Sequence, residues 1–134
     1  ILIPMRNFEF SQTLDASFLN EVDEDDLAYA VEIFESFMEA LSPGLLQLEE
    51  HFQRGDIAAF RSVAHRLKPS FSYVGLTGIT NQMASLEKSC LVIQRLEESA
   101  TLYQQVVKDI QASIPAIKLE LNRLKSHIQL EAKS

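Results

Sequence analysis

The sequence predicts an all-α fold, an antiparallel up-down four-helix bundle with one or two extra short helices before it. Apolar residues recur at spacings of three and four through most of the chain, which is the period of an amphipathic helix. The 134 residues include only four glycines and four prolines, and no sustained alternation of strand type is present. Short links join the amphipathic segments, so we expect one domain over 1–134 with its bundle core at 25–124.

Residues 1–13 lack helical periodicity, and we expect them to form an extended arm whose Phe8 and Phe10 pack on the bundle. A short helix is predicted for Asp15–Val22. The acidic residues of 23–26 follow, and carboxylates suit the first turn of a helix, where the helix dipole favours negative charge. Metal binding is the alternative interpretation of this cluster, and helix capping is favoured over it.

Two helices are predicted next, at about 25–41 and about 43–53. Ser42-Pro43-Gly44 separates them, because it combines a helix break with a helix-start signal. Arg54-Gly55-Asp56 then forms a helix–helix turn, in which the glycine ends one helix and the aspartate caps the next.

The second half of the chain predicts three longer helices, at about 57–74, 78–98 and 100–130. Gly75 is expected to end the first of them, and Thr77 to cap the second.

The last predicted helix contains Pro115, which has no N–H to donate, so we expect a bend near Gln111. Its apolar stripe fades only near the end, and the last two turns are expected to overhang the bundle. The stripe consists of Tyr103, Val106, Ile110, Ile114, Ile117, Leu121, Leu124 and Ile128.

His65 lies on the 57–74 helix about 130° from the centre of the apolar stripe, so its side chain is expected to face solvent. Arg61, Lys68 and Ser72 share this side of the helix with it. An exposed imidazole on a rigid helix, with cations and a hydroxyl around it, suits the acceptance of a phosphoryl group. The alternative is an ordinary surface histidine. The stripe consists of Ile57, Phe60, Ala64, Leu67, Phe71 and Val74.

The residues around this histidine resemble a known family signature. Ala64-His65-Arg66-Leu67-Lys68, followed by Ser70, Gly75 and Leu76, is similar to the pattern A-H-x-L-K-G-S-x-x-x-x-G-L of the histidine-containing phosphotransfer (HPt) domains of multistep phosphorelays. Leu86-Glu87 looks like the family's second-helix signature, and the similarity extends more loosely from about 14 to about 124.

The resemblance implies a phosphoryl carrier that has no catalytic machinery of its own and is not an enzyme. His65 would accept the phosphoryl group through Nε2, and Lys68 would stabilise the phosphoryl oxygens. Glu87 can hydrogen-bond the other ring nitrogen and so fix the tautomer. The alternative for Lys68 and Glu87 is an ordinary bridge between two solvated helix faces. The chain contains no Gly-rich nucleotide loop and no kinase motif.

Pro69 departs from the family pattern, which usually has glycine at this position to leave space above the imidazole. The ring of a proline presses on the carbonyl of the residue four before it, here His65, so we expect a local kink. This departure keeps a second function open, in which the chain is a non-phosphorylated, degenerate helical module that binds a partner through the same face.

The expected partners are response-regulator receiver domains and a hybrid sensor histidine kinase. The resemblance places the aspartyl phosphate and its Mg²⁺ on the receiver, so no cofactor and no metal are expected in this chain. Partners are expected to dock on an apolar patch beside the histidine. The residues expected to line the docking site are Arg61, Pro69, Phe71, Ser72, Tyr73 and Met83.

Composition excludes several other functions. The net charge of −7 disfavours nucleic-acid binding, which requires a basic surface. Cys90 is the single cysteine, so no disulfide can form within the chain, which fits a reducing compartment. No apolar run approaches the length of a membrane span, so no membrane insertion is expected. We therefore expect a cytoplasmic protein, and a monomer.

A metal-bearing four-helix enzyme of the di-iron type requires Glu-x-x-His pairs on two helices. His51, His65 and His127 are not preceded by glutamate three residues earlier, so no such pair exists. His51 has no obvious partner in the pattern and is expected at the surface.

Overall fold

The structure, a computed structural model, describes residues 8–16, 19 and 26–133. Within this part of the chain all regular secondary structure is helical, which confirms the predicted all-α class. Most of the predicted short helix at Asp15–Val22 and most of the acidic 23–26 cluster lie outside the described residues. The elements are α2 (Leu27–Arg54), α3 (Ile57–Tyr73), α4 (Thr77–Ser89), the 3₁₀ turn η1 (Leu96–Ser99) and α5 (Ala100–Lys133).

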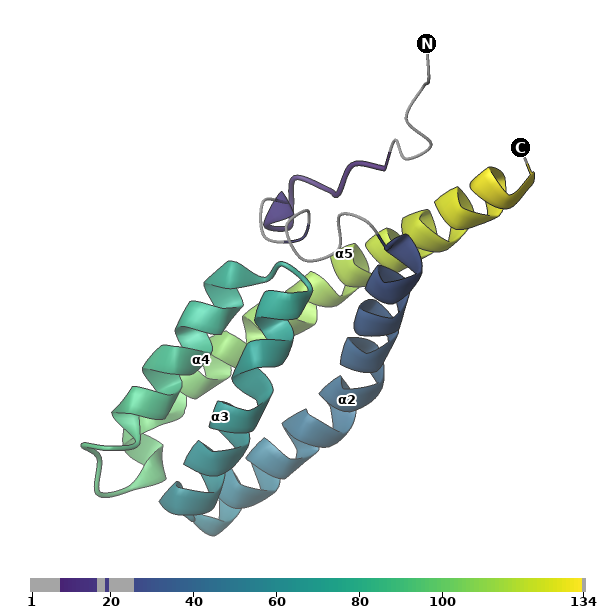
Figure 1. The fold of residues 1–134 in the computed structure, drawn as a ribbon. Helices are drawn as coiled ribbons and strands as arrows, with labels where there is room; N and C mark the ends of the chain where they lie inside the picture. Colours follow the sequence, from purple (N-terminus) through teal and green to yellow (C-terminus); the bar gives the residue numbers. More distant parts are fainter. Residues whose placement is uncertain (1–7, 17–18, 20–25, 134) are drawn as a thin grey trace.

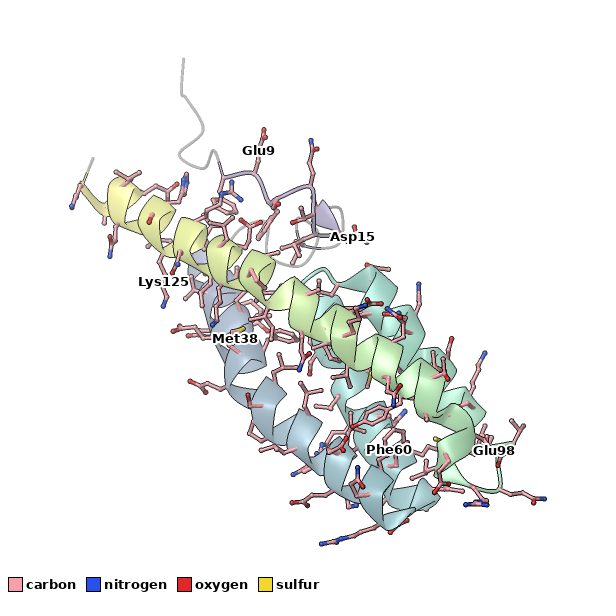
Figure 2. The ribbon with its side chains drawn as sticks, turned by 180° about the vertical axis from the view of Figure 1, so that it is seen from behind. Glu9, Asp15, Met38, Phe60, Glu98 and Lys125 are labelled. Atoms are coloured by element: carbon pink, nitrogen blue, oxygen red, sulfur yellow. The ribbon has the colours of Figure 1, made fainter. Side chains whose placement is uncertain are left out.

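The four α-helices form the antiparallel bundle that the sequence predicts, with each helix running opposite to the one before it (Figure 1). α3 packs against α2 and α4, and α5 packs against the same two helices from the other side of the bundle (Figures 1 and 2). The final turns of α5 project beyond the other helices, as expected from its fading stripe (Figure 1). None of the helices in the described part is both long and apolar enough to cross a bilayer.

The core lies where the apolar stripes of the four helices meet. Phe60 of α3 is fully buried inside the bundle, and its ring centroid lies 5.1 Å from that of Tyr103 on α5 (Figure 2). Further along α3, Phe71 packs edge-on against Phe37 of α2, with 5.6 Å between the ring centroids. The α3 stripe is therefore correctly predicted, although Ile57 at its start is only half-buried.

The predicted break at 42–44 is wrong, because α2 is one 28-residue helix that continues through Pro43. The reason is the packing of the next residue, Gly44, which is buried against Leu67 of α3. A Cβ at this glycine would lie 2.6 Å from the Leu67 Cδ2, so a larger residue here would displace the Leu67 side chain. α2 has buried residues both before and after Pro43, and the helix curves along its length (Figure 1).

The predicted C-terminal boundary of the helix at 78–98 is also wrong, because α4 ends at Ser89. The Ser89 hydroxyl donates a 2.7 Å hydrogen bond to the Leu86 carbonyl and lies 2.8 Å from the Ser99 hydroxyl. The Glu98 carboxylate accepts hydrogen bonds from the backbone N–H groups of Gln94 and Arg95, each at 2.8 Å. Side chains thus satisfy the backbone at this turn and make a helical continuation unnecessary.

The predicted caps around α2 and α3 are confirmed. Asp26 caps α2 by accepting a 2.9 Å hydrogen bond from the Tyr29 N–H. Gly55 ends α2 with φ 69°, a conformation that glycine adopts without strain. Asp56 caps α3 by accepting a 3.0 Å hydrogen bond from the Ala59 N–H.

Gly75 follows the end of α3 with φ 80°, as its position in the sequence predicts. The assignment of Thr77 as the cap of α4 is wrong, because Thr77 is already the first residue of that helix and Leu76 precedes it as the cap residue. The Thr77 hydroxyl instead donates a 2.9 Å hydrogen bond to Asp15 of the N-terminal segment. The Asp15 N–H donates in turn to the Gly75 carbonyl at 2.8 Å, so this segment is attached to the α3–α4 turn.

Two further prolines lie inside helices. Pro69 lies within α3, so the helix does not end at Lys68. Pro115 lies within α5, which runs without interruption to Lys133. The bend expected near Gln111 stays a prediction.

The N-terminal arm packs on α5, as expected from its aromatic residues. Phe10 is buried, and the ring of Phe8 meets the rings of Phe10 and His127 edge-on, with centroid distances of 5.1 and 5.4 Å. The guanidinium of Arg123 lies over the Phe8 ring at 4.8 Å. The arm therefore packs on α5 in the region of Arg123 and His127.

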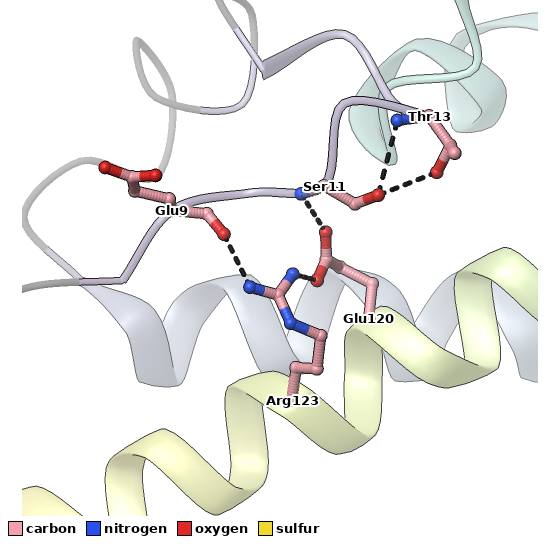
Figure 3. A network of polar contacts seen from close by, with 5 residues as sticks. All are labelled: Glu9, Ser11, Thr13, Glu120 and Arg123. Carbon is pink, nitrogen blue, oxygen red and sulfur yellow. Dashed lines mark hydrogen bonds and ion pairs between the residues drawn. The ribbon is translucent and has the colours of Figure 1, made fainter.

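A buried carboxylate on α5 holds this arm in place (Figure 3). Glu120 is fully buried, pairs with Arg123 one turn away, and accepts a 2.5 Å hydrogen bond from the Ser11 N–H. Arg123 donates a second hydrogen bond, at 2.8 Å, to the backbone carbonyl of Glu9. The charge of Glu120 is thus balanced by a cation and by a backbone N–H, as a buried charge requires.

Candidate functional site

His65 lies in the middle of α3 and faces solvent, as its position on the helical wheel predicts. Its side chain is 69% exposed, while its neighbour Ala64 is fully buried. The packing of α3 against α2 and α4 holds the backbone of this residue. The backbone of His65 is thus held in place while its imidazole ring is exposed, so the ring can contact a reacting group on another molecule.

Glu87 of α4 binds both His65 and Lys68. Its Oε1 lies 2.6 Å from the His65 Nδ1, and its Oε2 lies 2.9 Å from the Lys68 Nζ. The Glu87 side chain is only 13% exposed, and its two contacts with α3 fix the carboxylate between α3 and α4. An ionised carboxylate can only accept, so the neutral imidazole carries its proton on Nδ1 and its lone pair on Nε2.

The pKa of Glu87 is lowered from its ordinary value. The hydrogen bond from Lys68 is the largest cause, and the hydrogen bond to His65 and the charges of both partners act in the same direction, against the raising effect of burial. Glu87 is therefore ionised at neutral pH and acts as an acceptor for both side chains.

The other polar residues expected at the site lie on the same face of the bundle. Arg61, one turn before His65, is exposed, and no ion pair or hydrogen bond is found for its side chain within the described residues. Ser72 lies two turns after His65 and its hydroxyl is 3.0 Å from that of Thr80 on α4. Pro69 is exposed beside the imidazole.

The prediction that Phe71 and Met83 line the docking patch is wrong. Phe71 and Met83 are both fully buried, because each belongs to the core stripe of its helix, so neither can contact a partner. Tyr73 is half-exposed and lines a groove of about 510 Å³ between α2 and α3, together with Tyr29 and Phe37. This half-exposed aromatic surface therefore lies on the α2 side of α3.

His51 is half-buried rather than at the surface, and its Nδ1 is buried without a hydrogen-bond partner among the described residues. His127 packs against Phe8 and lies 3.0 Å from Glu131. His127 also has a glutamate beside its ring, but its side chain is only 22% exposed, against 69% for His65.

Sequence reasoning missed two residues that complete the surroundings of His65. Thr80 bonds to Ser72, and the antiparallel register that pairs His65 with Glu87 could have identified it. Gln47 binds the guanidinium of Arg66 from α2. No sequence signal pointed to Gln47, because the predicted break at 42–44 placed it on a separate helix.

Comparison with known families identifies the class of protein that this fold and site define. The family model of the Hpt domain matches residues 32–127, which is most of the chain. The chain belongs to the Hpt domain family, whose members take part in histidine phosphotransfer in phosphorelays. Searches of curated proteins and of solved structures found no match.

Proposed function

We propose that this protein is a phosphorelay intermediate, in which His65 accepts a phosphoryl group from the aspartyl phosphate of a receiver domain and passes it to another receiver. One observation carries the proposal: the exposed imidazole is bonded through Nδ1 to Glu87 at 2.6 Å, which leaves the Nε2 lone pair free. This is the nucleophile that phosphoryl transfer requires.

The transfer balances without a proton acceptor. The Nε2 lone pair forms the N–P bond while the P–O bond of the acyl phosphate breaks, and the aspartate leaves as a carboxylate. The imidazole, which already carries a proton on Nδ1, becomes a cation. Glu87 stabilises that cation because its carboxylate is 2.6 Å away, and in the reverse transfer the same ring leaves as neutral imidazole.

Lys68 supplies positive charge for the phosphoryl oxygens. Its Nζ is bound to Glu87 at 2.9 Å, one turn of α3 beyond His65. An ammonium has three donors, so one can stay on Glu87 while another meets a phosphoryl oxygen. The Mg²⁺ that neutralises the aspartyl phosphate is expected to come with the receiver domain.

Docking of the receiver would use apolar surface as well as charge. Tyr73 and Tyr29 are each about half-exposed at the groove between α2 and α3, and they replace Phe71 and Met83 as the apolar contacts. Salt screens exposed ion pairs but leaves apolar contacts intact. Binding should therefore weaken without disappearing between low and about 1 M salt; complete loss of binding in molar salt would mean that charge pairs dominate.

Pro69 favours one alternative, a non-phosphorylated interaction module of the same fold. It is exposed beside His65, and its ring occupies space that glycine would leave open. A labelling experiment separates the two functions.

The experiment incubates the protein with a receiver domain that carries radiolabelled aspartyl phosphate. Wild type, His51→Gln and His127→Gln should all take up label, and His65→Gln should not. The label should be acid-labile and stable to alkali, as expected for a phosphoramidate. No label on wild type with any receiver would favour the interaction module, and label persisting on His65→Gln would contradict the assignment of this histidine.

A further inference from the structure

Arg61 is a cation without a partner beside the candidate site. Lys68 is bound to Glu87 and Arg66 is bound to Gln47, whereas no hydrogen bond or ion pair is found for the Arg61 side chain within the described residues. The chain carries a net charge of −7, so acidic side chains are plentiful, yet none in the described part of the chain pairs with this guanidinium. Arg61 is therefore available to an anionic group on another molecule.

Two exposed apolar residues follow α4 at the end of the bundle where Arg61 lies. α3 and α4 are antiparallel, with Ser72 bonded to Thr80 and His65 to Glu87. Arg61 lies one turn before His65, and α4 ends at Ser89, so the turn that contains Leu91 and Val92 follows α4 at the level of Arg61, about 6 Å along the helices from the His65–Glu87 pair.

Electrostatics at Cys90 supports this placement of Arg61. Burial raises the pKa of the Cys90 thiol, and the charge of Arg61 acts on the same thiol in the opposite direction. Cys90 directly precedes Leu91, so the guanidinium lies close to the end of α4.

The turn after α4 exposes its apolar side chains. Leu91 is 63% exposed and Val92 is 83% exposed. Backbone hydrogen bonds from Leu91 to Lys88 and from Val92 to Ser89, at 3.0 and 3.2 Å, hold the turn. A single exposed leucine needs no explanation, but two consecutive apolar residues in an ordered turn beside a free cation form a surface that a partner can bury.

We infer that Arg61, Leu91 and Val92 form a second contact surface for the aspartyl-phosphate domain, on the α4 side of His65, that selects among partner domains. The inference rests on the proposed function. An ordinary protein interface covers about 800 Å² on each partner, which is a circle of about 16 Å radius. A partner domain centred on the His65 Nε2 would therefore cover these residues, unless the domain is displaced entirely towards α2. The matching partner surface carries a carboxylate beside an apolar side chain.

This surface has a matched control on the other side of the bundle. Lys118 and Leu119 are an exposed cation and an exposed leucine on α5, and Leu119 is 63% exposed, the same fraction as Leu91. α5 is separated from α3 by the bundle core, so a partner at His65 does not reach them (Figures 1 and 2).

The test measures transfer rates from a phosphorylated receiver to wild type, Arg61→Glu, Leu91→Asn with Val92→Asn, and the controls Lys118→Glu and Leu119→Asn. We expect Arg61→Glu to slow transfer about tenfold at low salt and by less than about twofold at about 1 M salt, because rim charges act mainly on association. The apolar double variant should slow transfer about tenfold at both salt concentrations, because apolar contacts are not screened. Both controls should stay within about twofold of wild type.

Chemical labelling of His65 by a small-molecule phosphoramidate separates docking from reactivity. All variants should react with it at the wild-type rate. If Arg61→Glu and the apolar double variant transferred phosphoryl groups as fast as the controls, the inference would be overturned. The proposed function would still stand in that case, because wild type accepts label. Equal loss of chemical labelling and transfer would also overturn it, since these residues would then act on His65 itself. Wild type that takes no label from any receiver would overturn the proposed function and the inference together.

Discussion

Glu87 of α4 lies with its Oε1 2.6 Å from the Nδ1 of His65 on α3. The bond joins an exposed imidazole on α3 to a carboxylate on α4 that is only 13% exposed. It fixes the orientation of the imidazole and the nitrogen that carries its proton. The reactive face of His65 is thus determined by a residue 22 positions later in the chain.

The first prediction concerns the tautomer of His65. In wild type, neutral His65 should carry its proton on Nδ1, and in Glu87→Ala both tautomers should be populated, because the acceptor is lost. Nitrogen-15 NMR of the imidazole rings measures this directly. Glu131→Ala is a matched control, because Glu131 bonds to His127, and it should leave the His65 signals unchanged. A wild-type proton on Nε2 would contradict the described geometry.

The second prediction concerns pH and stability. The pKa of Glu87 is lower in the folded state than its ordinary value of 4.5, so its ionised form stabilises the fold. That contribution is fully present above about pH 4.5 and is lost as the pH falls through the lower, folded-state pKa. Thermal unfolding of Glu87→Gln should therefore occur at a lower temperature than that of wild type at pH 7, and the difference should shrink in acid. If the difference in unfolding temperature grew in acid instead, the ionised form of Glu87 would not be the one that stabilises the fold.

The sequence predicted the bundle because helical periodicity is a local property, and burial follows it closely. Phe71 belonged to the predicted apolar stripe of its helix as well as to the expected docking patch, and the structure buries both Phe71 and Met83 in the core. The break predicted at Pro43 failed for a different reason. Whether Pro43-Gly44 ends a helix depends on the contact between Gly44 and Leu67 of α3, which no local pattern contains.

Partner identities within the site were only partly predictable. The motif selected His65, Lys68 and Glu87, and the structure brings these three together. The hydrogen bond between Arg66 and Gln47 depends on the rotation of α2 about its axis, which tertiary packing determines. The fully buried Glu120 was not anticipated either, because its partner Ser11 lies 109 positions away in the arm.

The third prediction concerns Pro69, which lies within α3 and is exposed beside His65. Replacing it with glycine restores the N–H that can bond to the His65 carbonyl and removes bulk from the approach to Nε2. An interior proline costs about 3 kcal/mol relative to alanine and glycine about 1, so Pro69→Gly should be neutral or stabilising by up to about 2 kcal/mol. Transfer to His65 should be as fast or faster.

Denaturant unfolding and transfer rates on Pro69→Gly measure these two effects. A loss of both stability and transfer rate would show that the site depends on the backbone geometry that the proline imposes.

The fourth prediction concerns the attachment of the N-terminal arm. Glu120→Ala removes the acceptor for the Ser11 N–H and the partner of Arg123, and we expect it to lower the free energy of unfolding by about 1–3 kcal/mol. Cleavage of the arm in limited proteolysis should become faster. Glu35→Ala is the matched control, because it breaks the exposed Glu35–Lys125 pair, and should cost no more than about 1 kcal/mol. Equal effects of the two substitutions would show that the buried network does not hold the arm.

The most direct test of the account locates the phosphoryl group on the labelled protein. After transfer from a receiver domain, phosphorus-31 and nitrogen-15 NMR of the protein identify both the histidine and the ring nitrogen that carry phosphorus. The account predicts a single phosphohistidine, at Nε2 of His65, with Nδ1 still protonated and bonded to Glu87. Phosphorus at Nδ1 of His65, or on His51 or His127, would contradict it.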